Sequence, residues 1–223
     1  MKLLMANRGE IACRILRTAK KMSIPTVAVY AEPDQDAAFV KLADQAYPLA
    51  FEHPSQDYLD IDTLIGIARA SGATCIHPGY GFLSENADFS LACEKAGIIF
   101  IGPPPAAIEA MGDKRAAKEQ MKKANIPIVP GYQGEDQSER ALLEAANAIA
   151  YPLLIKASAG GGGKGMRIVT NEKECRASIL ACQREALSSF GNDTLILEKL
   201  ITPARHIEVQ IIVDHTGQAL HLF

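Results

Sequence analysis

The chain has 223 residues, a hydrophobic fraction of 48%, a charged fraction of 22% and a formal net charge of -3. This composition is typical of a globular protein with one or two domains. The slightly negative charge provides no basic surface for nucleic acid or an anionic membrane, and no apolar run approaches the roughly 20 residues that span a bilayer. We therefore expect neither nucleic acid nor a membrane as a partner.

The cysteines and the first residues indicate a reducing compartment. The five cysteines are dispersed, and none forms a pair at the spacing of a metal or redox motif. The opening stretch MKLLMANRGE holds too short an apolar run for a secretory signal. We expect reduced thiols that mostly fill apolar space, in a cytoplasmic protein.

The first 111 residues alternate strand and helix patterns. Short apolar runs predict strands, and apolar residues at helical spacing predict helices between them. The predicted strands are KLLMA, TVAVY, ATCIHP and IIFIG, and the predicted helices are GEIACRILRTAKKM, YLDIDTLIGIARAS and NADFSLACEKAG. This alternation predicts an α/β fold with a Rossmann-like parallel sheet in a domain of residues 1–111.

Prolines and glycines separate this domain from the next. Three consecutive prolines precede AAIEAMGDKRAAKEQMKKAN, which predicts two helices broken near Gly112. The turn-rich stretch IPIVPGYQGEDQS follows. We expect a helical linker over residues 112–127 and a domain boundary at this point.

From residue 128 the pattern changes to α+β. It predicts strands at YPLLIKA, GMRIVT and TLILEKL, and a helix from about Glu172 to Leu187. The final stretch ARHIEVQIIVDHTGQALHLF predicts two strands joined at DHTG. We expect one domain over residues 128–200 and the first strands of another over residues 201–223, with apolar faces and edges left uncovered.

The stretch KASAGGGGKGMRIV places four consecutive glycines between two predicted strands. Bare backbone N–H groups can approach anionic oxygens closely, so this turn could fold over phosphates while Lys156 points at them from the entering strand. The spacing is not that of a Walker A loop, and the strand that follows argues against a Rossmann turn. The alternative is a flexible hairpin tip on which Lys156 and Lys164 are merely solvated.

Six stretches are distributed along the whole chain: ANRGEIACRILRTAKKM, IHPGYGFLSENADF, MGDK, YPLLIKASAGGGGKGMRIV, LEKL and RHIEVQI. In this order they resemble the biotin carboxylase family, an ATP-grasp family. The stretches PGYQGEDQSE and QREALSSFGND are most similar to the biotin-carboxylase-bearing α-subunits of acyl-CoA carboxylases, of the methylcrotonyl-CoA type. The resemblance implies that residues 128–200 are an ATP-grasp lid with a glycine-rich flap.

The resemblance also implies a reaction and partners. Family members use ATP, Mg²⁺ and bicarbonate to make carboxyphosphate, and then carboxylate the ureido nitrogen of biotin. The partners would be a biotin carboxyl carrier domain and a carboxyltransferase subunit, and family members often form homodimers. The location would be the cytoplasm, or the mitochondrial matrix in a eukaryote.

Matching positions imply an ATP site. Lys114 and Lys156 match lysines that contact the phosphates, and Gly162 and Gly163 fall in the phosphate-covering flap. Two lysines and backbone amides suit phosphoryl transfer, which depends on positioning and charge stabilisation. Without the resemblance, Lys114 would read as a helix N-terminal charge or a surface partner of Glu119.

The resemblance further implies that the end of LILEKLI holds adenine as a hinge between lid and body. The residues concerned are Glu198, Lys199, Leu200 and Ile201. From the pattern alone, a strand end that reaches solvent is the simpler interpretation.

In RHIEVQI, strand alternation would put His206 and Glu208 on one face and apolar residues on the other, buried face. The resemblance implies that His206 lies near the nucleotide, with Glu208 beside it. A plain amphipathic strand is the alternative.

The stretch IHPGYGFLSEN follows a predicted strand, where open α/β sheets place ligands. The resemblance implies that His77 and Glu85, together with Lys164 of the flap, line the active site without reacting. ANRGE also follows a strand, and Arg8 and Glu10 could either pair with each other or help bind a ligand.

The matched stretches cover about the first half of the family's catalytic unit. The Mg²⁺ ligands, the arginines for bicarbonate and biotin, and the general base would lie beyond Phe223. We therefore predict no catalytic residue and no metal ligand here, and little or no activity from these 223 residues alone. Two alternatives are another ATP-grasp ligase that joins a carboxylate to an amine, and a non-catalytic nucleotide-binding module.

Overall fold

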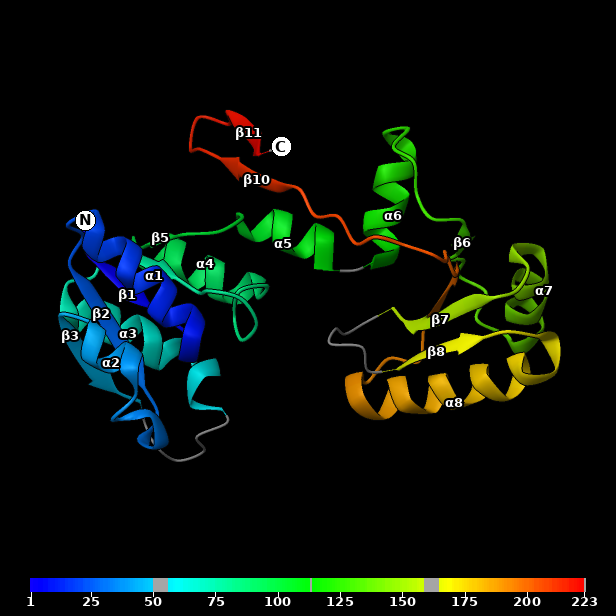
Figure 1. The fold of residues 1–223 in the computed structure, drawn as a ribbon, viewed down its shortest axis with the longest axis horizontal. Coiled ribbons are helices and arrows are strands. Elements are labelled where there is room, and N and C mark those ends of the chain that lie inside the picture. The colour runs from blue at the N-terminus through cyan, green and yellow to red at the C-terminus, as the bar shows by residue number, and fades with distance from the viewer. Residues whose placement is uncertain (50–55, 113, 159–164, 223) are drawn as a thin grey trace. The chain divides into compact units, whose positions relative to one another are not determined.

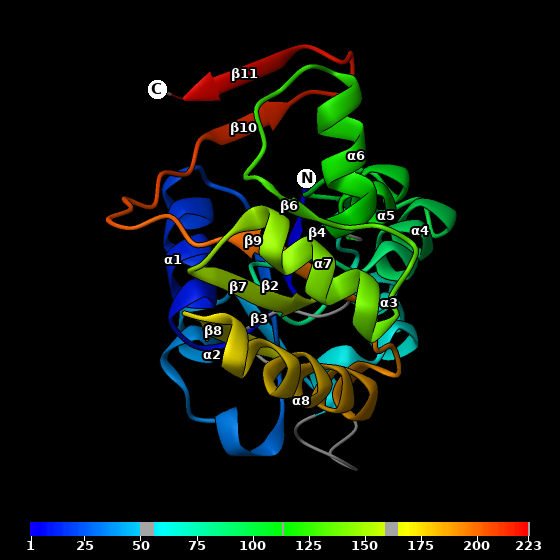
Figure 2. The ribbon, with the colours of Figure 1, turned by 90° about the vertical axis from the view of Figure 1, so that its right-hand side faces the viewer.

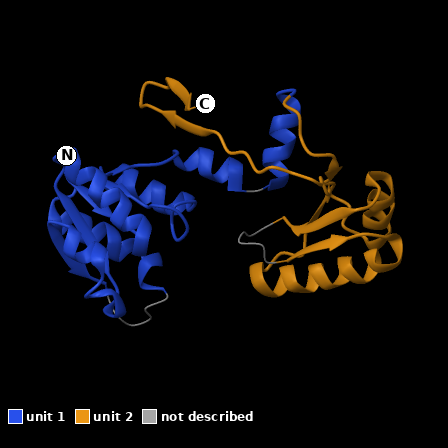
Figure 3. Ribbon diagram, in the orientation of Figure 1, with its two compact units in different colours: residues 1–125 blue, residues 126–223 orange. Residues whose placement is uncertain are grey.

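The computed structural model describes residues 1–49, 56–112, 114–158 and 165–222. The chain divides into two compact units, Met1–Asn125 and Ile126–Phe223 (Figure 3). Each unit has its own hydrophobic core, so each is described by itself. None of the described helices is long and apolar enough to cross a membrane.

The first unit is built on a five-stranded, fully parallel sheet with the strand order β3-β2-β1-β4-β5. The strands are β1 (Leu3–Met5), β2 (Thr26–Tyr30), β3 (Gln45–Pro48), β4 (Cys75–His77) and β5 (Ile99–Phe100). The predicted parallel α/β sheet is confirmed. β3 was not predicted, because its sequence QAYP is not an apolar run; as an edge strand it is mostly exposed.

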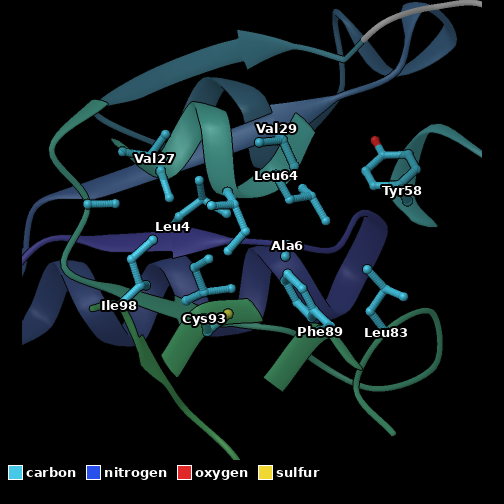
Figure 4. Close-up of a cluster of buried hydrophobic side chains, with 14 of the residues drawn as sticks. Leu4, Ala6, Val27, Val29, Tyr58, Leu64, Leu83, Phe89, Cys93 and Ile98 are labelled. Atoms are coloured by element: carbon cyan, nitrogen blue, oxygen red, sulfur yellow. The ribbon is translucent and has the colours of Figure 1, made fainter. Parts of the chain in front are cut away.

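Helices cover both faces of this sheet (Figure 1). They are α1 (Gly9–Lys21), α2 (Ala38–Leu42), α3 (Ile61–Ser71) and α4 (Ala87–Lys95), with short 3₁₀ turns at Glu32–Asp34 and Asp57–Leu59. Successive residues of β1 point to opposite faces. Leu3 and Met5 therefore join the core under α1 and α2, whereas Leu4 joins the core of α3 and α4. Figure 4 shows this second core around Leu4, Leu64 and Phe89.

The chain reverses direction across this sheet at β1. The segments that follow β1 build outward through β2 and β3, and α3 then returns the chain to β4 on the other side of β1. The carboxyl ends of β1 and β4 therefore flank the topological switch point, where open α/β sheets form a crevice.

Two helices end the first unit. α5 (Pro105–Gly112) buries Ile108, whereas α6 (Lys114–Lys123) buries none of its described residues. The predicted break near Gly112 is confirmed by the separate bounds of the two helices.

The second unit carries an antiparallel four-stranded sheet with the order β6-β9-β7-β8. Its strands are β6 (Gly131–Tyr132), β7 (Leu153–Ala157), β8 (Met166–Val169) and β9 (Leu195–Lys199). Two helices, α7 (Glu139–Ile149) and α8 (Glu172–Phe190), pack on one face (Figures 1 and 2). The predicted helix and three long strands are confirmed.

α7 was not predicted, although its sequence carries clear signals. Ser138 caps it by accepting a hydrogen bond from the Ala141 N–H, and Leu142 and Ala146, one turn apart, are fully buried. The loop-like composition before Ser138 obscured this start.

The second unit ends in a hairpin of β10 (Gln210–Val213) and β11 (Ala219–Leu222). The predicted hairpin at DHTG is confirmed, and every described residue from Ile201 onward is exposed. The expectation that residues 201–223 leave apolar faces uncovered is confirmed for the described residues, since Ile207 and Val209 are 68% and 53% exposed. The prediction that RHIEVQI forms one strand whose apolar face packs in a core is wrong, because β10 begins only at Gln210. Among the described residues no second layer covers this segment, so alternation alone does not bury a face.

Candidate functional site

The sheet of the second unit has one face covered by helices and one face that carries charge. Strand alternation sends Leu153, Ile155 and Ala157 under α7 and α8, where they are 0–4% exposed. The opposite face, which we call the open face, carries alternate residues of three strands: Leu154, Lys156, Met166, Ile168, Ile196 and Glu198. Ile196 is buried, whereas Met166 and Ile168 are 43% and 59% exposed.

On the open face, apolar side chains lie next to an ion pair. Lys156 Nζ contacts the Glu198 carboxylate, and their side chains are 26% and 14% exposed. Because Leu154 pairs with Glu198 and Lys156 pairs with Ile196, the two charged residues are diagonal neighbours across β7 and β9. An aromatic ring could lie on the apolar part while an anion meets the ammonium.

The glycine run lies next to this ion pair in the chain. Gly162, Gly163 and Lys164 lie outside the described residues, so their predicted roles stay predictions. The strand ends on either side are held together, since the Ala157 N–H donates to the Gly165 carbonyl at 3.2 Å. Gly165 has φ +67° and donates its N–H to Glu185 on α8 at 3.1 Å, so the base of the flap is anchored to a helix.

The predicted hinge follows β9, which lies between β6 and β7 in the sheet. Lys199 N–H donates to the Pro130 carbonyl, and Leu200 N–H donates to the Pro152 carbonyl. Lys199 Nζ donates to the Ala150 and Tyr151 carbonyls at 3.1 and 3.0 Å. These bonds direct the Lys199 ammonium away from Glu198, the residue that Lys156 contacts. Ile201 is 53% exposed.

The remaining predicted nucleotide residues do not belong to the sheet of the second unit. His206 and Glu208 form a pair at 3.1 Å in the extended segment before β10, and both side chains are 83% exposed. Lys114 begins α6 in the first unit and is exposed. Of the predicted ATP residues that the structure describes, Lys156 and Glu198 contact each other, and the ATP-binding roles of all of them stay predictions.

A second candidate region lies at the switch point of the first unit. An open cleft of about 330 Å³ is lined by Asn7, Arg8, Gly9, Glu10, Ile11, Tyr80, Gly81 and Phe82. Asn7 is buried, and its amide donates to the Pro78 and Tyr80 carbonyls at 2.7 Å each. Gly79 has φ +68°, and a Cβ there would lie 2.8 Å from the Asn7 amide nitrogen. Asn7 therefore clamps the loop after β4 to the end of β1.

Arg8 and Glu10 do not pair with each other, because each has a different partner. Arg8 makes a two-pronged contact with Asp34, both nitrogen–oxygen distances being 2.5 Å, and the Tyr58 hydroxyl donates to the same carboxylate at 2.8 Å. The hydrogen bond from Arg8 lowers the pKa of Asp34, and burial raises the pKa of Tyr58. Glu10 accepts a hydrogen bond from the Tyr80 hydroxyl.

His77 and Glu85 flank this loop without joining the cleft lining. His77 Nδ1 accepts the Gly79 N–H at 3.0 Å, and burial, aided by Arg14, lowers the pKa of His77. The neutral imidazole is thus a loop-shaping acceptor. Glu85 is exposed beside Asn86, the N-cap of α4.

The thiols and acidic groups show no metal centre among residues 1–49, 56–112, 114–158 and 165–222. All five cysteines are buried and unbridged, as predicted for apolar fillers. Burial raises the pKa of Cys93 to about 11, which keeps its thiol protonated and unreactive.

Sequence reasoning missed the apolar half of the open face. Leu154, Met166 and Ile168 lie on the same side of the sheet as Lys156. The signal was present, because residues at even spacing from Lys156 share its face and antiparallel pairing extends that face to the next strand. Identifying these residues required the pairing register of β7 and β8, which the glycine run between the two strands did not reveal.

Two family profiles divide the chain between them. The profile of the biotin carboxylase N-terminal domain matches residues 1–108, and that of the carbamoyl-phosphate synthase L chain ATP-binding domain matches residues 113–223. The chain belongs to the biotin carboxylase family. The profile boundary lies at α5 and α6, the helices between the sheet of the first unit and that of the second.

Relatives in the family match over the whole chain. The mitochondrial methylcrotonoyl-CoA carboxylase subunit alpha of Mus musculus is 50% identical over all of this chain and 31% of its own length. Biotin carboxylase 1 of Bacillus subtilis is 46% identical over 99% of this chain and 49% of its own. The chain therefore spans between about a third and a half of these relatives.

Solved structures agree. The Campylobacter jejuni biotin carboxylase complex with β,γ-ATP has a TM-score of 0.93 at 44% identity, covering 99% of this chain and 49% of that one. The biotin carboxylase domain dimer of Hydrogenobacter thermophilus 2-oxoglutarate carboxylase, solved with MgADP, ADP and bicarbonate, has a TM-score of 0.91 at 46% identity, covering 99% and 48%. The α/β and ATP-grasp architecture expected from the sequence is thereby confirmed.

Proposed function

We propose that this chain supplies the N-terminal domain and the nucleotide lid of a biotin carboxylase, which carboxylates biotin with ATP and bicarbonate. The observation that carries the proposal is the open face, where a lysine at the base of the glycine run adjoins an apolar sheet surface. The named ligands of the structural relatives, MgADP and bicarbonate, support it. The chain's relatives are carboxylases, which does not favour another ATP-grasp ligase or a non-catalytic module.

The open face fits a nucleotide part by part. An adenine ring would pack on Leu154, Met166 and Ile168, whose exposed apolar area suits a flat aromatic ligand. The Lys156 ammonium would meet phosphate oxygens, with Gly162 and Gly163 covering them and Lys114 contributing from α6. MgATP would supply the phosphoryl group that activates bicarbonate for transfer to biotin.

The remaining roles follow the family. The hinge residues Lys199, Leu200 and Ile201 would border the adenine, His206 and Glu208 would approach the nucleotide, and His77, Glu85 and Lys164 would line the site. As functional parts we propose an N-terminal domain of residues 1–111, a helical linker of residues 112–127, a lid of residues 128–200 and the start of a third domain at residues 201–223.

We further propose that the chain belongs to the α-subunit of an acyl-CoA carboxylase, of the methylcrotonyl-CoA type. Identities of 50–53% to methylcrotonoyl-CoA carboxylase alpha subunits support this assignment. Its partners would be a biotin carboxyl carrier domain, a carboxyltransferase subunit and a second copy of itself. The location would be the cytoplasm, or the mitochondrial matrix in a eukaryote.

Calorimetric titration of MgADP into the wild-type chain and Lys156→Ala tests the nucleotide site. We expect binding by wild type and a loss of affinity of about tenfold or more in the variant. The matched control is Lys173→Ala, which removes an exposed lysine from α8 on the other side of the same sheet and should bind like wild type. No binding by wild type, or equal losses in both variants, contradicts the proposal.

A further inference from the structure

The first described residue after the glycine run, Gly165, is bonded to two different elements. Its carbonyl accepts the Ala157 N–H of β7 at 3.2 Å, and its N–H donates to the Glu185 carboxylate of α8 at 3.1 Å. A hydrogen-bonded pair in an antiparallel ladder exchanges both bonds, so in a continued ladder the Gly165 N–H would return a bond to the Ala157 carbonyl. Glu185 takes this donor instead, and the paired register of β7 and β8 ends at Lys156 and Met166.

The backbone at this point suits only glycine. Gly165 is buried and has φ +67°, a left-handed conformation that residues with a side chain rarely adopt. A Cβ on Gly165 would also lie 3.3 Å from the Ala157 Cβ, which is closer than such carbons usually approach. The chain therefore enters β8 through one constrained residue, and the N–H of that residue is directed at α8.

The carboxylate that accepts this N–H is oriented by Arg167 of β8. The Arg167 guanidinium lies 3.4 Å from Glu185 Oε2, while Glu185 Oε1 accepts the Gly165 N–H. The Arg167 and Glu185 side chains are 46% and 41% exposed, so this ion pair adds little to stability. Its consequence is geometric, because one oxygen held by Arg167 leaves the other directed at the end of the glycine run.

The chain that enters the glycine run has a different anchor. The Ser158 N–H donates at 2.8 Å to the carbonyl of Thr194, the residue that precedes β9. The entering side is thus bonded next to β9, whereas the leaving side is bonded to α8. The positions of these two anchors limit where the backbone N–H groups between them can lie.

We propose that Glu185 is a positioning residue for the glycine run: by accepting the Gly165 N–H, its carboxylate ends the β7–β8 pairing and fixes the end of the run to α8. The anchoring follows from the described contacts. Its effect on ligand binding rests on the proposed nucleotide site, in which backbone N–H groups of the run meet the phosphates. Glu185 itself contacts no part of the nucleotide in this arrangement.

Amide hydrogen exchange tests the anchoring without a ligand. Exchange at the Gly165 N–H is measured by NMR in wild type, Glu185→Gln and Glu185→Ala. We expect protection in wild type and exchange within about twofold of it in Glu185→Gln, because the amide oxygen of glutamine still accepts a hydrogen bond. In Glu185→Ala the Gly165 N–H loses its acceptor and should exchange about tenfold faster or more.

Glu174 provides a matched control on the same helix. Its carboxylate accepts the Thr170 N–H, just beyond the other end of β8. Glu174→Ala should speed exchange at the Thr170 N–H, and it should leave both the Gly165 N–H and MgADP affinity as in wild type. This comparison separates anchoring of the glycine run from a general loosening of β8 on α8.

Calorimetric titration with MgADP and with adenosine tests the effect on the ligand. Glu185→Ala should bind MgADP about fivefold more weakly than wild type or worse, because the N–H groups of the run lose their fixed position. Its affinity for adenosine should not change, since adenosine has no phosphate for those groups to meet. Glu185→Gln should bind MgADP within about twofold of wild type.

Three results would overturn the role of Glu185 alone. One is equal exchange at the Gly165 N–H in wild type and Glu185→Ala. Another is wild-type MgADP affinity in Glu185→Ala. The third is an equal loss of MgADP and adenosine affinity in Glu185→Ala, or the same loss of MgADP affinity in Glu174→Ala, either of which would mean that Glu185 only stabilises the second unit as a whole. No MgADP binding by wild type would instead contradict the proposed function, and the positioning role with it.

Discussion

Single polar side chains shape the switch-point crevice of the first unit. Asn7 reaches two carbonyls of the loop after β4, and Arg8 is fixed by Asp34 and, through it, by Tyr58. The sequence showed that both loops follow strands, but the pairing of Arg8 with Asp34, 26 residues away, depends on the fold. Contacts of this kind could not be read from the local pattern.

Replacing Asn7 should unlock the loop. Asn7→Ala leaves two carbonyls without their donor, and we expect a loss of about 1–3 kcal/mol in the free energy of unfolding, measured by urea titration. Asn7→Asp keeps the shape but turns the donor into a carboxylate facing carbonyls, so it should destabilise at least as much. Wild-type stability in Asn7→Asp would show that the side chain only fills space.

Asp34 should make the protein sensitive to acid. Because its pKa is lower in the folded than in the unfolded chain, its contribution is complete above the unfolded value of about 4 and is lost as the pH falls through the folded value. Urea unfolding between neutral pH and pH 3 should therefore show a shallower loss of stability in Asp34→Asn than in wild type. Asp36→Asn, at a side chain that is 98% exposed, is the control and should follow wild type.

At the scale of elements, most strands and helices were predictable from apolar runs or helically spaced apolar residues, whereas β3 and α7 were missed. β1, β2, β4, α1 and α8 carry continuous or helically spaced apolar residues that the sequence displays directly. β3 pairs at a sheet edge with little burial. α7 has both a Ser138 cap and buried apolar residues one turn apart, but the loop-like stretch before Ser138 obscured its start. The segment 206–209 alternates like a strand but belongs to no strand among the described residues, and it is exposed.

The two faces of the second sheet should respond differently to the same truncation. Ile155→Ala removes a fully buried side chain under α7 and α8 and should lower the free energy of unfolding by about 2–5 kcal/mol. Ile168→Ala, on the open face and 59% exposed, should change it by less than about 1 kcal/mol. Urea denaturation measures both, and equal losses would mean that the open face is covered in solution.

At the scale of the whole molecule, the two units have separate cores, and the final hairpin of the second unit contributes no residue to its core. The apolar clusters of the first unit end at Phe100, and that of the second runs from Tyr132 to Leu197. β10 and β11 expose Ile211, Ile212 and Leu220 by 53–60%. A two-stranded ribbon with apolar faces and unpaired edges is prone to self-association.

A charged residue on this hairpin should reduce self-association between copies of the chain. Ile212→Lys is expected to lower the apparent molecular mass in concentration-dependent sedimentation runs and to leave the melting temperature unchanged, because no described core residue contacts it. Leu187→Lys on α8, where the leucine is 55% exposed against 53% for Ile212, is the matched control. Equal effects of the two variants would show that self-association depends on how polar the whole surface is and not on the hairpin.

The open face also offers an optical handle. The chain contains no tryptophan and six tyrosines, so its intrinsic emission is that of tyrosine alone. An indole introduced by Ile168→Trp would be the sole tryptophan, half in water and beside Met166 on the surface proposed to carry the adenine. A stacked purine would quench and shift that single emission band, turning the exposed side of an ordinary sheet into a direct reporter of what lies on it.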